Sequence, residues 1–87
     1  MTSYKIEWKQ SAKKELKKLD KQIIPRILQA VESLADNPYS SGSKKLIGSN
    51  SNYRLRVGNY RIVYSIQSSI LTIEIIKVGH RRDIYRQ

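Results

Sequence analysis

Residues 53–67 carry the pattern that most restricts the fold of this chain. Apolar side chains alternate with arginines over 53–57, and a second strand-like stretch covers 60–67. Alternation with a period of two indicates a strand with one buried face. Gly58 and Asn59 separate the two stretches, and a two-residue link that begins with glycine is typical of a type II′ hairpin turn. We therefore predict an antiparallel β-hairpin.

A third strand is expected directly after this hairpin. Ser68 and Ser69 form a second two-residue link, and isoleucine, leucine and valine dominate residues 70–78. Three strands joined by short turns form a β-meander. Because this last segment is apolar on both sides, we place it in the middle of the sheet.

The N-terminal half predicts one strand and two helices. Strand periodicity covers residues 4–8, and Ser11 is the expected N-cap of a first helix with a narrow apolar stripe and a lysine-rich outer side. A second helix with a broad apolar face follows over 23–35, and the Asp-Asn-Pro sequence at 36–38 ends it. The short link between these segments indicates a helical hairpin.

Residues 37–52 are rich in Asn, Ser and Gly and are expected to form a loop. The whole order is then strand, helix, helix, strand, strand, strand. This order predicts an α+β fold in which an N-terminal strand and a helical hairpin precede a three-stranded antiparallel meander, with the helices packed on one face of the sheet. A chain of 87 residues is expected to form a single domain, spanning 1–87.

The charge of the chain favours a polyanionic partner. Lysine and arginine number 17 against 7 aspartates and glutamates, which gives a net charge of +10 and a pI near 10.1. Such a field attracts nucleic acid first, because phosphate contacts supply most non-specific binding energy. An acidic protein is a second partner compatible with this charge. A membrane surface is not expected, because no amphipathic segment carries the large apolar residues that insertion needs.

The chain contains no cysteine, which excludes disulfides and thiolate metal sites. The N-terminus has no apolar run of the kind found in a signal peptide, and no stretch has the length of a membrane span. We therefore expect a cytoplasmic protein.

The hairpin turn also predicts which side chains meet across the two strands. It sets Arg56 opposite Arg61 and Arg54 opposite Val63, so that the three arginines share one face. Like charges directly opposite each other are unfavourable by a few tenths of a kcal/mol or more, roughly, unless a ligand compensates. A phosphate cradle built from guanidinium groups explains the pattern, and a solvated face with tolerated arginines is the alternative.

The segment after the last strand adds further candidates for chemistry: His80, Arg81, Arg82 and Tyr85. We expect neither a metal ion nor a cofactor, because the sequence has no cluster of carboxylate, cysteine or histidine ligands. RNA supplies its own nucleophile, the 2′-hydroxyl, so that cleavage needs a base, an acid and positive charge for the phosphorane. Histidine titrates near neutral pH, and tyrosine acts as a base where arginines lower its pKa. Binding without cleavage would use the same residues.

The chain resembles the RelE/ParE toxin superfamily of bacterial toxin–antitoxin modules over nearly its whole length. The resemblance is most specific at residues 53–64 and 78–85, and the Lys44-Lys45-Leu46 segment is also typical. The RelE type is the closer match. RelE-type toxins cleave mRNA in the ribosomal A site without a metal ion and so block translation. The resemblance implies a catalytic set of Arg54, Arg56, Arg61, Arg81 and Tyr85. Beside this set, we keep His80 as a further catalytic candidate from its chemistry, and we expect the basic residues Lys44, Lys45 and Arg82 to contact RNA.

Some members carry lysines at the positions of Arg54 and Arg56. Arginine cannot act as a general base at neutral pH, so that the role of base falls to Tyr85 or His80 in this chain. Because the chain ends at Gln87, we expect no long C-terminal helix of the kind found in some members.

The resemblance also implies partners. These are the ribosome with its mRNA and a cognate antitoxin, whose acidic wrapping segment covers the toxin in a hetero-oligomer that binds operator DNA through the antitoxin. Two alternative functions remain open. One is a ParE-like inhibitor of DNA gyrase, which gives Tyr85 no evident task. The other is a non-catalytic RNA-binding module, for which the predicted arginine face lacks the usual aromatic platform.

Overall fold

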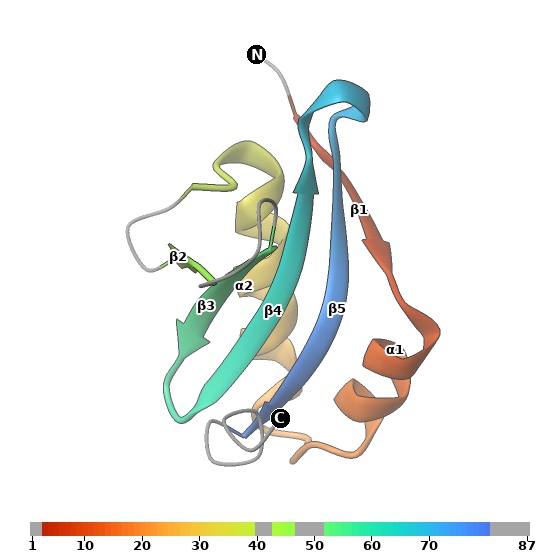
Figure 1. The fold of residues 1–87 in the computed structure, drawn as a ribbon. Coiled ribbons are helices and arrows are strands. Elements are labelled where there is room, and N and C mark those ends of the chain that lie inside the picture. The colour runs from red at the N-terminus through yellow and green to blue at the C-terminus, as the bar shows by residue number, and fades with distance from the viewer. Residues whose placement is uncertain (1–2, 40–42, 47–51, 81–87) are drawn as a thin grey trace.

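The computed structural model describes residues 3–39, 43–46 and 52–80, which form five strands and two helices around one core (Figure 1). The elements are β1 (Lys5–Trp8), α1 (Gln10–Lys17), α2 (Ile24–Asp36), β2 (Ser43–Lys45), β3 (Asn52–Val57), β4 (Tyr60–Gln67), a 3₁₀ turn (Ser68–Ile70) and β5 (Thr72–His80). The α+β fold predicted from the sequence is confirmed.

All five strands belong to one sheet in the order β1-β5-β4-β3-β2. Strands β2 to β5 follow one another as antiparallel neighbours, whereas β1 runs parallel to β5. The first strand thus joins the same sheet as the meander, and its parallel pairing makes the sheet mixed. Parallel neighbours require a long connection, and the chain between β1 and β5 contains both helices and strands β2 to β4.

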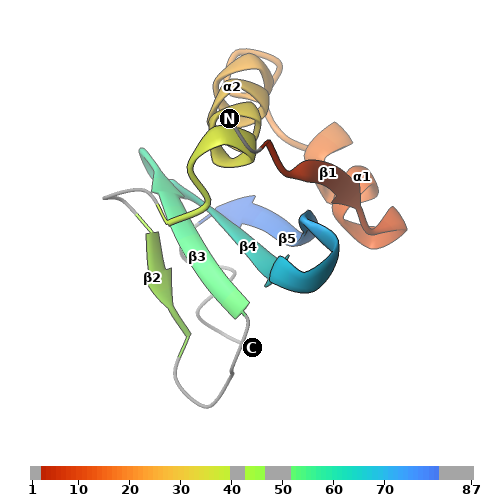
Figure 2. The same cartoon turned by 90° about the horizontal axis from the view of Figure 1, so that it is seen from above.

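Helix α2 lies across one face of the sheet, and α1 lies beside the β1–β5 edge (Figure 2). The core between the two helices and the sheet is aliphatic with one tyrosine, and its most buried members are Ala12, Ile27, Leu34, Ile62, Tyr64, Ile73 and Ile75. We call the sheet face turned away from α2 the outer face. In the described ranges, no helix is long enough and apolar enough to cross a membrane.

The predicted limits of the helices hold better at α2 than at α1. Helix α2 has Pro25 in its first turn and ends at Asp36, as expected. Helix α1 begins at Gln10 with Lys9 as its N-cap, so the prediction of Ser11 as the cap is wrong. The reason is tertiary: the backbone N–H of Lys9 donates to the carbonyl of Ile75, 2.9 Å away, which makes Lys9 the last residue bound to the sheet.

The predicted loop over 37–52 contains a strand that the sequence did not reveal. Strand β2 pairs antiparallel with β3, setting Lys44 opposite Arg54 and Lys45 opposite Tyr53. The N–H of Leu46 adds a bond of 2.9 Å to the carbonyl of Asn52. A segment of low strand propensity becomes a strand here because the edge of β3 offers hydrogen-bonding partners.

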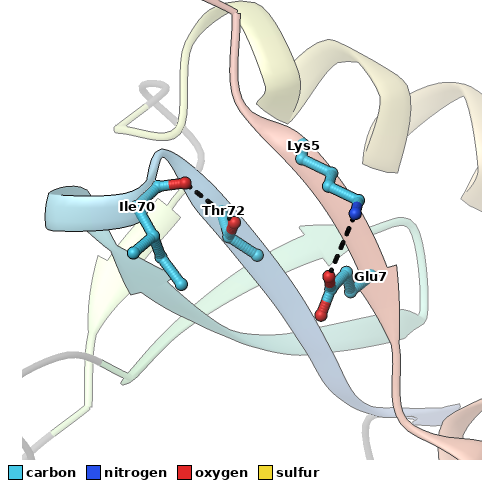
Figure 3. Close-up of polar contacts among 4 residues, drawn as sticks. All are labelled: Lys5, Glu7, Ile70 and Thr72. Atoms are coloured by element: carbon cyan, nitrogen blue, oxygen red, sulfur yellow. Dashed lines mark hydrogen bonds and ion pairs between the residues drawn. The ribbon is translucent and has the colours of Figure 1, made fainter.

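The link between β4 and β5 is longer than predicted. Ser68–Ile70 form a 3₁₀ turn and Leu71 adopts a left-handed conformation with φ of 49°, so that β5 begins at Thr72 rather than at Ile70. The hydroxyl of Thr72 donates to the carbonyl of Ile70 at 3.0 Å (Figure 3). Strand β5 is nevertheless central, as predicted, because β1 and β4 flank it.

Candidate nucleic-acid interface

The β3–β4 hairpin has the predicted register. Gly58 has a φ of +59°, whereas the φ of Asn59 is not positive. This is the φ pattern of a type II′ turn. Arg56 pairs with Arg61 across this hairpin. Since paired residues point to the same side of a sheet, both arginines lie on the outer face.

Register across β2 to β5 extends this arrangement into two transverse rows on the outer face. The first row contains Lys44, Arg54, Val63 and Lys77, and the second contains Arg56, Arg61 and Gly79. We call them the basic rows. Strands are spaced at about 4.8 Å, so the first row spans about 14 Å across the sheet. Five cations and no carboxylate thus occupy the basic rows.

Arg61 is the most enclosed cation of the basic rows. It is 2% exposed although it points away from α2, and it lies on β4, an inner strand of the sheet. A guanidinium keeps its charge even when buried. Its field is also less screened than that of a surface lysine, so Arg61 is a preorganised positive charge at the centre of the rows.

The other arginines of the rows are more accessible. Arg56 is exposed, Arg54 is half-buried, and Lys44 at the edge of the sheet is exposed. More accessible cations therefore lie on the β3 side of the buried Arg61. This combination suits a polyanion, because guanidinium groups on long stems adjust to phosphate oxygens while the central charge stays in place.

Lys77 belongs to the basic rows, and sequence reasoning missed it. Tyr64 pairs with Ile75 but Val63 pairs with Lys77, which leaves Ile76 as the extra residue of a β-bulge. Strict alternation from Ile73 and Ile75, both in the core, would have pointed Lys77 into the core. The bulge reverses this and places Lys77 on the outer face.

Two predicted site residues lie on the opposite face of the sheet. Lys45 pairs with Tyr53, which packs against the core, so Lys45 does not join the basic rows. His80 pairs with Tyr60, and the two rings meet edge to face with centroids 5.4 Å apart. The structure therefore brings Lys44, Arg54, Arg56 and Arg61 together, and it separates Lys45 and His80 from them.

The remaining predicted site residues, Arg81, Arg82 and Tyr85, lie outside the described residues. Within the described part of the chain, no three histidine, cysteine, aspartate or glutamate side chains are grouped to hold a metal ion.

Comparison with known proteins gives a consistent picture. Residues 6–85 match the model of the family described as the ParE toxin of the type II toxin–antitoxin system parDE. Toxin RelG of Mycobacterium tuberculosis is 31% identical over 88 residues, which cover 97% of this chain and 98% of RelG.

Solved structures resemble the fold closely. The RelBE2 toxin–antitoxin complex of M. tuberculosis contains a chain with a TM-score of 0.82 and 27% identity, covering 92% of this chain and all of that one. A chain in the archaeal RelE–RelB complex of Pyrococcus horikoshii has a TM-score of 0.81 and 28% identity, covering 92% of this chain and 97% of that one. With the family match over 6–85, these likenesses show that the chain belongs to the RelE/ParE superfamily, as a RelE-like toxin of a type II toxin–antitoxin system.

Proposed function

We propose that this toxin is a ribosome-dependent endoribonuclease that cleaves mRNA in the A site, without a metal ion, and thereby inhibits translation. The observation that carries the proposal is the pair of basic rows, with the buried Arg61 at their centre. RelE-type toxins cleave in this way, and the chain's likeness to RelE-like proteins supports the same activity here.

The basic rows fit the demands of the reaction. The 2′-hydroxyl of the RNA gives its proton to a base and attacks the adjacent phosphorus, which forms a dianionic phosphorane. The bond to the 5′-oxygen then breaks, and that oxygen takes up a proton. Arg61, with its charge held in a poorly screened position, stabilises that negative charge. Arg54 and Arg56 hold the flanking phosphate oxygens, and Lys44 extends the contact to the edge of the sheet.

The general base has to come from outside the basic rows, because arginine stays protonated at neutral pH. Of the two candidates from the sequence, His80 contacts Tyr60 on the helix side of the sheet. We therefore assign the base to Tyr85, with Arg81 and Arg82 as further cations from the same tail. His80 then serves in packing against Tyr60 rather than in the reaction.

Purified toxin incubated with translating ribosomes tests the proposal. Primer extension on the mRNA is expected to reveal new 5′ ends within the codon held in the A site, and naked mRNA under the same conditions should stay intact. Tyr85→Phe provides the matched control, because it removes one hydroxyl and should abolish these ends. Intact mRNA at toxin concentrations that stop growth would refute the proposal.

Inhibition of DNA gyrase is a second candidate function, because the family model that matches the chain is that of ParE toxins. A supercoiling assay with purified gyrase separates the two. Loss of supercoiling with intact mRNA favours the ParE-like activity, whereas unaffected supercoiling with cleaved mRNA favours the ribonuclease.

An antitoxin is the proposed protein partner. Both solved complexes described above pair a RelE-like chain with RelB. An acidic antitoxin segment lying on the basic rows would neutralise them and exclude RNA, in a toxin–antitoxin hetero-oligomer that reaches operator DNA through the antitoxin. Since translating ribosomes are the proposed target, we place this activity in the cytoplasm.

A further inference from the structure

Among the residues that the structure describes, the C-terminal part of β5 has no strand paired with it on the β1 side. β1 pairs with β5 from Thr72 to Ile75, and the last bond between them runs from the N–H of Lys9 to the carbonyl of Ile75. The chain then turns into α1, so that the end of β5 lies beside a helix instead of a strand (Figure 1). Backbone groups on this side of β5 need side chains or water as partners.

Glu15 supplies such a partner. It is the one acidic residue of α1, a helix whose sequence is otherwise polar, apolar or lysine. One carboxylate oxygen, Oε1, accepts a hydrogen bond of 3.1 Å from the N–H of Val78, and the other, Oε2, lies 3.8 Å from the Nζ of Lys77. Glu15 thus connects α1 to β5 by a hydrogen bond. Its other carboxylate oxygen faces Lys77, the cation at the end of the first basic row.

The pair between Glu15 and Lys77 is loose. Its side chains are 34% and 26% exposed, and a separation of 3.8 Å is near the outer limit for an ion pair. Even solvent-accessible pairs with good geometry contribute only about 0–1 kcal/mol, and this separation is long, so that a phosphate oxygen can compete for the ammonium group. Glu15 keeps its second role, as the acceptor for Val78, when the ammonium group turns away from it.

We propose that Lys77 is a phosphate-binding residue of the toxin, which extends the RNA contact across β5, and that Glu15 is its counter-ion until RNA displaces the carboxylate. The inference rests on the proposed function, because it takes RNA as the polyanion. It adds a subsite on the fourth strand of the rows, beyond the arginines of β3 and β4. The subsite takes a phosphodiester of the RNA backbone and makes no contact with a base.

The matched control is the Lys5–Glu7 pair on β1. The Nζ of Lys5 lies 3.5 Å from Oε1 of Glu7, and the register with Thr72 places Lys5 on the same outer face, away from the basic rows. Lys5→Ala therefore removes the same charge from the same face and breaks the same kind of pair. Any effect of net charge alone is common to Lys5→Ala and Lys77→Ala.

The experiment measures binding of a short single-stranded 2′-O-methyl RNA to the full-length toxin over a range of salt concentrations. This RNA lacks the nucleophilic hydroxyl and cannot be cleaved. Loss of one phosphate contact reduces the slope of log affinity against log salt by about 0.7. We expect this reduction for Lys77→Ala and an unchanged slope for Lys5→Ala. Equal slopes for wild type and Lys77→Ala, or equal losses in both variants, would overturn the inference.

Glu15→Gln tests the role of the counter-ion. The amide oxygen still accepts the hydrogen bond from Val78, but the charge facing Lys77 is gone. RNA affinity is expected to rise about twofold to fivefold, more than for Glu7→Gln, and the gain should vanish when Lys77→Ala is present. A gain that persists without Lys77 would contradict the proposed competition.

Because binding and cleavage are measured separately, the two proposals can fail separately. Intact mRNA on ribosomes together with the reduced salt slope of Lys77→Ala would refute the endoribonuclease and leave the phosphate subsite in place. Cleaved mRNA together with an unchanged slope would refute the subsite alone.

Discussion

The outer face of the sheet has two halves with the same backbone and different chemistry. Towards the β4–β5 link, Glu7 pairs with Glu74, and the ammonium of Lys5 lies 3.5 Å from Glu7 (Figure 3). Towards the β3–β4 turn, Arg56 pairs with Arg61. Each half therefore contains a like-charge pair, but the acidic pair has a cation bound beside it, whereas the basic rows collect five cations.

This difference indicates that the position of a charged residue on the sheet, more than the net charge of the chain, determines whether it can contribute to binding a polyanion. A like-charge pair disfavours the folded sheet slightly, by a few tenths of a kcal/mol or more, roughly. In the half with Glu7 this cost is offset by Lys5 within the protein. Within the described residues, Glu15 is the one carboxylate that an ion pair brings to the basic rows, and it lies at their edge. The five cations of the basic rows would together attract a polyanion lying on this half of the sheet.

The largest expected effect comes from removing the central charge of the basic rows. Arg61→Ala should lower the rate of mRNA cleavage on ribosomes by about 10²- to 10³-fold, because loss of one preorganised donor to a developing anion has that effect. Primer extension over time measures the rate. Because Arg61 is buried, a thermal unfolding measurement on the variant has to show that it still folds. A folded variant that cleaves within about tenfold of wild type would place the transition-state charge elsewhere.

Charge reversal in each half tests the comparison directly. Arg54→Glu and Lys5→Glu change the net charge equally and lie on the same face. Arg54→Glu should weaken RNA binding by about tenfold or more, since a charged hydrogen bond contributes about 1.5–3 kcal/mol, while Lys5→Glu should change it far less. Fluorescence anisotropy with labelled RNA measures both. Similar losses would mean that net charge alone sets affinity.

The turn that sets the register of the basic rows offers a smaller effect. Gly58→Ala should destabilise the fold by about 1 kcal/mol, because a side chain at a φ of +59° is strained. The added Cβ would lie 3.9 Å from Nη2 of Arg26, which is ordinary contact, so the cost is conformational. Gly58→Asn is the control, since asparagine tolerates this region better. Chemical denaturation provides the comparison, and equal stabilities for alanine and asparagine would argue against strain.

The smallest effect is expected for the exposed ion pair of the acidic half. Lys5 and Glu7 have side chains that are 73% and 52% exposed, so that solvent screens their attraction. Lys5→Ala should change the free energy of unfolding by less than about 0.5 kcal/mol and leave RNA binding nearly unchanged. A larger loss would show that Lys5 neutralises the Glu7–Glu74 pair more strongly than its exposure implies.

Local pattern was sufficient for the hairpin and for much of the site. The alternation from Tyr53 to Val57 assigns side chains to faces, and the two-residue turn at Gly58 sets the partner of each arginine. Both are short-range properties, since side chains alternate along any strand and turn length determines the register of a hairpin. The sequence by itself therefore determined that Arg54, Arg56 and Arg61 share a face.

Four other features depended on neighbours that are distant in the chain. Strand β2 exists because β3 offers it an edge, and Lys9 caps α1 because β5 binds its N–H. The bulge at Ile76 moves Lys77 from the expected core side to the basic rows. Burial of Arg61 likewise requires β4 to lie between β3 and β5. Only the tertiary structure decided these features, because pairing, bulges and desolvation arise from contacts that local periodicity does not encode.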